Sequence, residues 1–151
     1  MRLEVHLPVA AVIAAGTYLL SKSAEMSISC FLAGILIDLD HVFDYFVCEG
    51  IKFNIKDFFD KCYRTELKKY YLFLHSYEFI LIVAVILYLT KSKIFLGVFI
   101  GITTHFLLDV FRSPKYFFIY SFFYRLNCNF DSDRTFKLLD RKNCSASSEL
   151  P

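Results

Sequence analysis

The sequence lacks the features that define several classes of small protein. It has no run of lysine and arginine interleaved with aromatic residues, and its formal net charge is only +2, so a nucleic-acid-binding groove is not predicted. Its five cysteines are odd in number, widely spaced and without a Cys-x-x-Cys pair. This spacing argues against a disulfide framework and against a thiolate zinc site. The cysteines are therefore expected to pack as small apolar residues in a reducing or membrane setting.

Apolar residues are abundant instead. The 151 residues are 56% hydrophobic and 19% aromatic, with a mean hydropathy of +0.47, which is high for a soluble domain of this size. Segments of about 16 to 20 residues, close to the length that crosses the hydrocarbon core of a bilayer, lie at 5–20, 28–47, 70–89 and 94–111. The sequence predicts an all-α membrane protein with about four transmembrane helices.

The segments between and after these spans also have recognisable patterns. Residues 91–93 leave so short a connection that the third and fourth spans should form an antiparallel helical hairpin. Within 49–69, apolar residues recur at helical spacing among charged ones, which predicts a helix lying on a membrane surface. The aromatic run 116–124 is too short to span and is expected at the interface or against a partner. The chain is thus divided into a helical membrane domain, 1–126, and a polar C-terminal tail, 127–151.

The distribution of basic residues predicts the orientation. With four crossings, fourteen lysines and arginines fall on one side and three on the other, so the positive-inside rule places both termini in the cytoplasm and the protein in the inner (cytoplasmic) membrane. The start of the chain partly imitates a secretory signal, but residues 21–23, Ser-Lys-Ser, make a poor cleavage site. We therefore expect the first segment to be retained, either as a full span or partly in the interface.

The histidines carry the functional prediction. The chain has only four, and each lies at one end of a proposed span beside acidic or polar residues. The groups are His6, then Asp38, Asp40, His41 and Asp44, then His75, and finally His105 with Asp109. Because successive spans alternate in direction, all four groups should meet on the cytoplasmic side.

Ionisable groups at such depths are costly, by about 2.5 to 3.5 kcal/mol for an aspartate at the centre of a span, so they persist where they face one another, water or an ion. Asp38 and His41 are three residues apart, and His105 and Asp109 are four apart, so each pair shares a helix face. Imidazole and carboxylate ligands without thiolate favour zinc, manganese or iron. Two such ions about 3.5 to 4 Å apart could hold a phosphoester for hydrolysis.

These considerations assign roles to individual residues. His41 and Asp44 are the candidates for a catalytic base or an orienting group. The predicted ligands of one or two divalent ions, most simply zinc or manganese, are His6, Asp38, Asp40, His41, His75, His105 and Asp109.

The same residues resemble the motifs of the YdjM-like family of membrane-bound metal-dependent hydrolases, also described as LexA-binding inner-membrane proteins. That family has an early histidine, a glycine-led Pro-Asp-x-Asp-His block, a His-Ser pair and a His-x3-Asp pair followed by a proline and an aromatic region. The matching residues, between about 5 and 125, are His6, 34–41, His75 with Ser76, His105 with Asp109, Pro114 and 120–122. Two positions depart from the pattern: Ile37 stands where the family has proline, and 70–74 replace a His-Arg element. The resemblance implies a helical membrane hydrolase with metal ligands at these positions.

Three functions remain open from the sequence. The first is a metal-dependent hydrolase that acts on a phosphoester or a lipid ester at headgroup depth. The second is a divalent-cation transporter, since membrane histidines and aspartates also line ion pathways. The third is a membrane scaffold with a structural metal and a protein partner, or with the histidines serving only as hydrogen-bonding contacts between helices. The lipid bilayer is the expected surrounding in all three.

Overall fold

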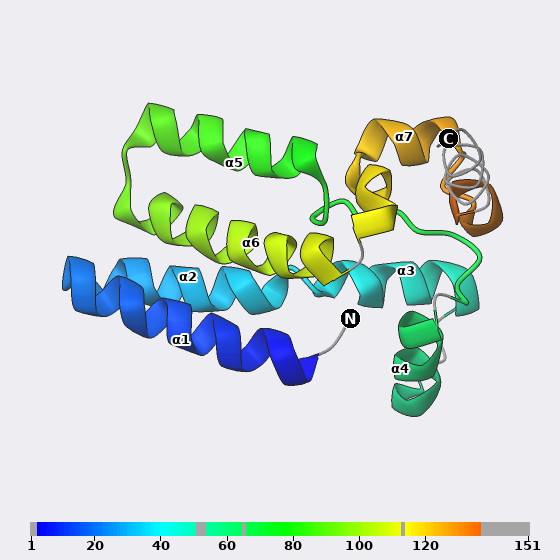
Figure 1. Ribbon diagram of the computed structural model, residues 1–151, viewed down its shortest axis with the longest axis horizontal. Helices are drawn as coiled ribbons and strands as arrows, with labels where there is room; N and C mark the ends of the chain where they lie inside the picture. Colours follow the sequence, from blue (N-terminus) through cyan, green and yellow to red (C-terminus); the bar gives the residue numbers. More distant parts are fainter. Residues whose placement is uncertain (1–2, 51–53, 65, 113, 137–151) are drawn as a thin grey trace, which may run out of the picture.

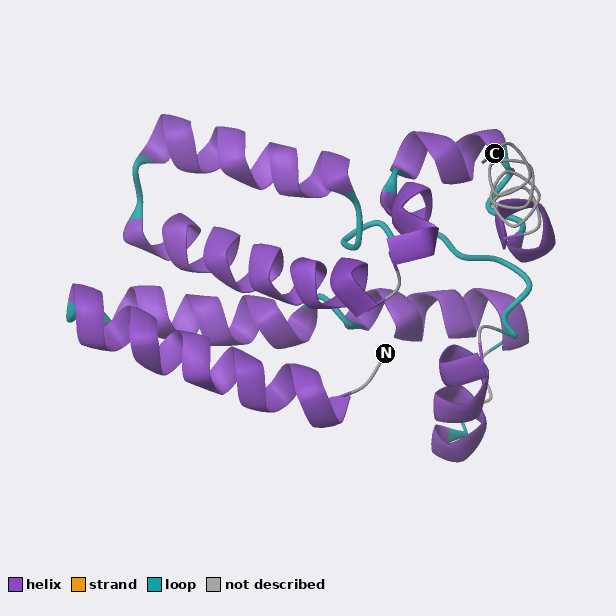
Figure 2. Ribbon diagram, in the orientation of Figure 1, coloured by secondary structure: helices purple, strands orange, loops and turns teal. Residues whose placement is uncertain are grey.

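The computed structural model describes residues 3–50, 54–64, 66–112 and 114–136, and these residues are helical or irregular, with no strand among them (Figures 1 and 2). The all-α prediction is confirmed. The elements are α1 (Leu3–Ser21), α2 (Ala24–Leu36), α3 (Leu39–Glu49), α4 (Ile55–Arg64), α5 (Tyr77–Thr90), α6 (Lys93–Arg112), the 3₁₀ helix η1 (Pro114–Tyr120) and α7 (Phe122–Asn127).

Helices α1, α2, α5 and α6 form an elongated bundle, and α3, α4, η1 and α7 form a cap at one end of it (Figure 1). The turn from α1 to α2 and the turn from α5 to α6 both lie at the opposite end. The turn into α2 is stabilised by Ser23, whose side chain accepts a hydrogen bond from the amide of Met26, as an N-cap residue does. In the second turn Lys91 adopts the left-handed conformation, with φ 49°. The predicted hairpin of α5 and α6 is confirmed.

Small residues bring α2 and α6 into close contact. A Cβ placed on Gly97 would lie 2.2 Å from the carbonyl oxygen of Met26, and one placed on Gly101 would lie 2.2 Å from that of Cys30. Neither position can hold a side chain without the helices separating. The two glycines are four residues apart and so lie on one face of α6. Their contact with α2 fixes how α6 lies on α2, and with it the position of His105 and Asp109 further along α6.

The second predicted span is interrupted between α2 and α3. The amide of Ile37 bonds to Ala33 in the α-helical pattern, but the amide of Asp38 bonds to Ile35, three residues back, so the helix tightens into a 3₁₀-like turn. The carbonyl of Gly34 is left out of the helical ladder as a result. No proline causes this break: residue 37 is an isoleucine, and its amide keeps its hydrogen bond to Ala33.

The third predicted span, 70–89, is wrong at its start. The helix α5 begins only at Tyr77, where Ser76 caps it by accepting a hydrogen bond from the amide of Phe79. Residues 70–75 form an irregular segment between the bundle and the cap. With 14 residues, α5 is about 21 Å long, shorter than the ~30 Å hydrocarbon core of a bilayer.

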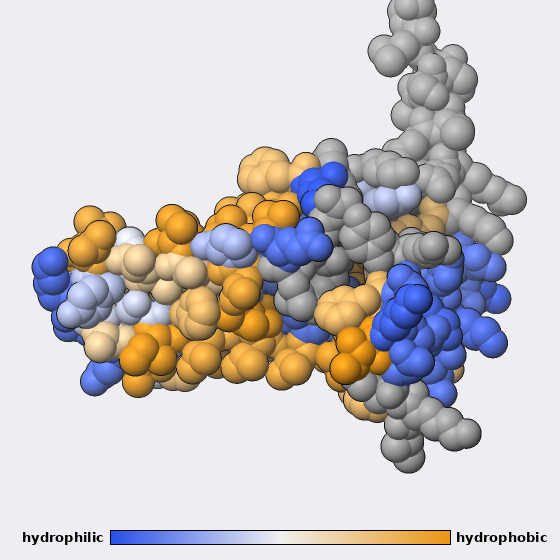
Figure 3. All heavy atoms as spheres, turned by 90° about the horizontal axis from the view of Figure 1, so that it is seen from below, coloured by the Kyte–Doolittle hydropathy of each residue, from blue (hydrophilic) through white to orange (hydrophobic). Residues whose placement is uncertain are grey.

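By length and composition, three helical segments can cross a membrane: Glu4–Ser21, Ala24–Glu49 and Lys93–Arg112, the second of which joins α2 and α3. The apolar helix Tyr77–Thr90 is a shorter fourth. In Figure 3 a hydrophobic band covers the bundle between hydrophilic residues at its two ends. This arrangement is that of a membrane-inserted bundle.

The cap has its own apolar core. A helix is present within 49–69, as predicted: it is α4, whose buried Phe58 and Cys62 pack with Tyr45 of α3. Residues 130–132 run beside 68–70, with hydrogen bonds from Tyr70 to Phe130 and from Ser132 to Lys68. The start of the predicted polar tail therefore packs on the cap, and the rest of the tail, from 137, lies outside the described residues.

The cysteines of the described part are free, as expected. Cys30, Cys62 and Cys128 are buried and Cys48 is half-buried. Burial raises the pKa of the Cys62 thiol to about 12, so it is uncharged at neutral pH. Cys144 lies outside the described residues.

Candidate metal centre

The predicted histidines and two of the predicted aspartates converge where the bundle meets the cap. His6 lies near the start of α1, and Asp38 and His41 lie at the break between α2 and α3. His75 precedes α5, while His105 and Asp109 occupy the last two turns of α6. All six are buried or nearly so, and even the most exposed, Asp109, has only 15% of its side chain accessible. Two groups of three within this cluster have the geometry of a metal site.

The first triad consists of His6, His105 and Asp109, whose ligand atoms lie within 4.8 Å of one another. The Nε2 atom of His6 is 3.2 Å from Asp109 Oδ1, and that of His105 is 3.5 Å from Asp109 Oδ2. The two imidazole rings are stacked with their centroids 4.0 Å apart. One carboxylate and two imidazoles therefore face a common point between α1 and α6.

The second triad consists of Asp38, His41 and His75. Asp38 Oδ1 lies 3.6 Å from Nε2 of His75 and 4.0 Å from Nε2 of His41. Its members come from the break between α2 and α3 and from the irregular segment before α5. The helix break and the irregular segment together turn these three side chains toward one point.

The two triads are in direct contact. His75 Nε2 lies 3.4 Å from His105 Nε2, Asp38 Oδ1 lies 3.4 Å from His105 Nε2, and Asp109 Oδ2 lies 3.7 Å from His75 Nε2. Each carboxylate therefore contacts a histidine of the other triad. Shared carboxylates are the arrangement expected where two cations lie side by side.

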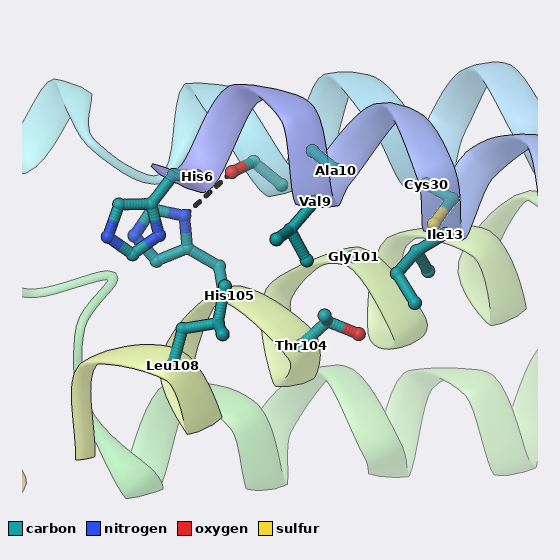
Figure 4. Close-up of a pocket in the computed structure, with 10 residues that line it drawn as sticks. His6, Val9, Ala10, Ile13, Cys30, Gly101, Thr104, His105 and Leu108 are labelled. Carbon is teal, nitrogen blue, oxygen red and sulfur yellow. Dashed lines mark hydrogen bonds between the residues drawn. The ribbon is translucent and has the colours of Figure 1, made fainter. Parts of the chain in front are cut away.

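The outer nitrogens of two histidines are held by the surrounding protein. His105 Nδ1 is 2.7 Å from the Gly34 carbonyl oxygen, which the helix break leaves available (Figure 4). A carbonyl can only accept, so Nδ1 carries a proton, and Nε2 is the nitrogen that faces the cluster. His75 Nδ1 is likewise 3.3 Å from Asp40 Oδ2. Orientation of a ligating imidazole by a carbonyl or carboxylate is the usual arrangement around a protein-bound metal.

Unsatisfied atoms provide the test of whether an ion fits. Both oxygens of Asp38, Nδ1 of His6 and Nδ1 of His41 are buried without a hydrogen-bond partner among the described residues. A buried carboxylate that accepts no hydrogen bond is costly, so Asp38 requires positive charge beside it, from a cation or from the protonated histidines within 4 Å of its Oδ1. The donors are nitrogen and oxygen with no thiolate, as suits a divalent ion. The cluster can hold a metal ion.

Asp40 and Asp44, which the sequence placed among the ligands and bases, have other partners. Asp40 Oδ2 accepts hydrogen bonds from the backbone amides of Leu74 and His75 as well as facing the His75 ring. Asp44 is fully buried one turn further along α3, where both oxygens accept from the amide of Tyr71 at 3.1 Å. Neither belongs to a triad. Both hold the segment that carries His75, so they are better described as positioning residues.

Arg125 is the residue that the sequence did not single out. It is fully buried in α7 and donates hydrogen bonds to the carbonyl oxygens of His75, Leu72 and Ile119. Burial lowers its pKa to about 10, partly offset by nearby carboxylates, so it stays protonated at neutral pH. A lone arginine inside an otherwise apolar and aromatic run was the available signal. Only the folded structure shows that two of its three partners, His75 and Leu72, lie some fifty residues earlier.

The pKa of His75 is set by its burial and by the carboxylates beside it. Burial disfavours its charged form, but the nearby carboxylates of Asp38 and Asp40 outweigh that effect and raise its pKa. Glu78 of α5 lies outside the cluster: its carboxylate accepts from the Ser121 hydroxyl and the amide of Phe122, both at 2.9 Å, at the start of α7. These contacts hold the aromatic segment against α5.

In comparisons with protein-family models, curated proteins and solved structures, no match to this chain was found. The resemblance to the YdjM-like family accordingly stays a prediction from the motifs. The fold and the geometry of the cluster stand on this chain's own residues.

Proposed function

We propose that this protein is an integral membrane hydrolase that uses two divalent ions, most simply zinc or manganese, to cleave a phosphoester or an ester of a lipid. One observation carries the proposal: two His/Asp triads in direct contact, buried at the end of an apolar helical bundle. The YdjM-like resemblance of the same residues supports it.

The residues of the cluster divide into two ion-binding sets in this proposal. His6, His105 and Asp109 hold one ion, and Asp38, His41 and His75 hold the other. Bound ions would acidify water into a nucleophile and neutralise the charge of a phosphoester.

The depth of the cluster supports a lipid substrate. Arg112 is the basic residue in the last turn of α6, and His105 and Asp109 lie seven and three residues before it. At 1.5 Å per residue these side chains branch off about 10 and 5 Å inside the helix end. With a hydrocarbon core of ~30 Å in a bilayer of ~40 to 45 Å, that is roughly the depth of headgroup and ester linkages.

The first experiment is metal content by elemental mass spectrometry on detergent-purified protein supplied with zinc or manganese. Wild type should hold about two ions per chain, and His6→Ala and His41→Ala should each lose one. Both His105→Ala and Asp109→Ala should lose at least one, since these residues contact both triads. The matched control is Leu107→Ala, an exposed position on the same helix, which should keep both ions.

A metal-loaded protein can then be tested for hydrolysis of lipid phosphoesters and esters in mixed micelles. Product that depends on metal and disappears in Asp109→Ala would support the enzyme. Wild type without metal would overturn the metal site and leave the polar cluster as contacts between helices. Bound metal with no hydrolysis of any lipid or phosphoester would favour the scaffold, and metal flux in vesicles would favour the transporter.

A further inference from the structure

The geometry points to Glu78 as a positioning residue for the ion of the second triad, acting on His75 through α7 and Arg125. The inference rests on the proposed function, because this ion is one of the two proposed there, and it makes that ion's site depend on how α7 is docked. Glu78 lies in the first turn of α5, three residues after His75, and is half-buried.

Both oxygens of Glu78 accept hydrogen bonds from the start of α7. Its Oε1 atom accepts from the Ser121 hydroxyl at 2.9 Å and from the amide of Phe123 at 3.5 Å, and its Oε2 atom accepts from the amide of Phe122 at 2.9 Å. Ser121 is the N-cap of α7, and its oxygen accepts in turn from the amide of Tyr124. One side chain of α5 therefore satisfies two of the amides with which α7 begins.

These contacts matter because α7 is too short to be stable alone. It has six residues, Phe122–Asn127, and isolated helices shorter than about 12 to 15 residues are marginal unless the rest of the protein holds them. The Tyr77 hydroxyl donates to the Phe117 carbonyl at 3.2 Å, so η1 is also held by the first turn of α5. That turn is therefore the support on which η1 and α7 rest.

Arg125 carries the effect of Glu78 back to the second triad. It lies in α7, fully buried, and donates to the carbonyl oxygens of His75 at 3.4 Å and Leu72 at 2.8 Å. The contacts close a ring: Glu78 holds α7, Arg125 of α7 holds the His75 carbonyl, and three peptide bonds lead from His75 back to Glu78. A shift of α7 would move the guanidinium and release the segment that carries His75.

Charge links Glu78 to Arg125 as well. Burial lowers the pKa of Arg125, and Glu78 offsets that effect more than the other carboxylates near the guanidinium do. Loss of the Glu78 carboxylate should therefore loosen α7 and also make the buried arginine costlier to keep in place.

The two ions should differ in their dependence on Glu78. The ligands of the first triad, His6, His105 and Asp109, lie on α1 and α6, two helices of the bundle. In the second triad, His75 lies on the irregular segment that Arg125 holds. Glu78 should therefore matter for the second ion and not for the first.

The test is calorimetric titration with zinc of the full, detergent-purified chain in two backgrounds that each keep one complete triad. In His6→Ala the second triad remains, and Glu78→Ala should weaken zinc binding there by about tenfold or more, as loss of a group that orients a ligand does. In His41→Ala the first triad remains, and Glu78→Ala should change zinc binding by no more than about twofold, as expected for independent sites. Equal weakening in both backgrounds would overturn the inference, because Glu78 would then stabilise the protein in general.

A double variant tests the route through Arg125. If Glu78 acts through that residue, Glu78→Ala combined with Arg125→Met should weaken zinc binding in the His6→Ala background no further than Arg125→Met alone. Additive losses would overturn the route, because the two residues would then act independently.

Two controls separate positioning from loss of stability. Glu25 is exposed in the first turn of α2, at the opposite end of the bundle, so Glu25→Ala should leave zinc binding unchanged in both backgrounds. Phe58→Leu loosens the core of the cap between α3 and α4 and should lower thermal stability without a selective loss of the second ion. The same selective loss in Phe58→Leu would overturn the inference, since any weakening of the cap would then suffice.

Hydrogen exchange of the metal-free protein separates this inference from the proposed function. The amides of Leu74 and His75 donate to Asp40, so their exchange reports whether the segment is held in place. They should exchange several-fold faster in Glu78→Ala than in wild type or Glu25→Ala. Faster exchange in a protein that binds no zinc would support the positioning of His75 by Glu78 and overturn the proposed hydrolase. Two bound zinc ions, with exchange and affinity both unchanged in Glu78→Ala, would overturn the positioning role and leave the proposed function intact.

Discussion

The guanidinium of Arg125 lies 3.4 Å from the backbone carbonyl oxygen of His75 and donates a hydrogen bond to it. The same group donates to the Leu72 carbonyl at 2.8 Å, while Asp40 accepts from the amide of His75 on the other side of the segment. A ligand carried by an irregular segment is thus held through its carbonyls by α7 and through its amides by α3. This clamp lets a loop position a metal ligand as firmly as a helix would.

Replacement of Arg125 by methionine should disrupt the second triad. The change removes three hydrogen bonds from a charged donor to buried carbonyls, each worth about 1.5 to 3 kcal/mol, so we expect more than about 4 kcal/mol of destabilisation. The ion of the His75 triad should be lost before that of the His6 triad, in metal content measured over a range of free metal. Arg134→Met is the control, because Arg134 is exposed in the cap and should change neither quantity. Equal loss of both ions would contradict a role specific to the His75 segment.

Asp40 provides a direct comparison between a ligand and a positioning residue. If Asp40 only orients His75, Asp40→Ala should weaken metal binding about 10- to 100-fold and still reach two ions per chain at saturating metal. Asp40→Asn keeps an oxygen that can accept from the amides of Leu74 and His75, so it should recover part of the affinity. Isothermal titration with zinc measures both. Loss of one ion at every concentration would restore the ligand role predicted from the sequence.

The sequence predicted that the histidines converge. It did not predict which residues hold them in position, and the reasons are physical. Alternating span direction places His6, His41, His75 and His105 at one end of a helical bundle whatever the details of packing. By contrast, hydropathy cannot tell that 70–76 is irregular, because its aromatic residues are as apolar as those of a span. Nor can it distinguish Asp38 from Asp40, which differ only in the direction each takes after the helix break. Arg125 depends on contacts some fifty residues apart, and no local pattern encodes those.

Substitution of Gly101 by alanine should separate α2 from α6. Its Cβ would lie 2.2 Å from the Cys30 carbonyl oxygen, so the helices must move apart, at a cost of roughly 1 to 3 kcal/mol. His105 is one turn further along α6 and should move away from Asp38, which weakens metal binding. Gly16→Ala is the matched control, because nothing lies within 4 Å of its Cβ and alanine favours the helix by about 1 kcal/mol. Thermal unfolding and metal content measure both effects, and equal behaviour of the two variants would contradict the close packing.

The docking of α4 on α3 should weaken in acid. The Tyr45 hydroxyl donates to Asp57 Oδ2 at 2.8 Å, and the Lys61 ammonium lies 3.1 Å from the same oxygen. The hydrogen bonds from Tyr45 and Lys61 lower the pKa of Asp57, so its carboxylate is more acidic in the folded than in the unfolded chain. A lowered pKa of this kind adds stability above the ordinary aspartate value of about 3.9 and loses it as the pH falls through the folded value.

Asp57→Asn tests this directly, because it removes the titrating group. Hydrogen exchange of the α4 amides should be faster in Asp57→Asn than in wild type at pH 7, and the difference should shrink below about pH 4, where wild type also loses the charge. Comparison at equal pH cancels the intrinsic pH dependence of exchange. The control is Asp60→Asn, an exposed position on the same helix, which should exchange like wild type throughout. A difference that persists unchanged into acid would mean that packing of Phe58 and Cys62, and not the Asp57 carboxylate, holds α4 in place.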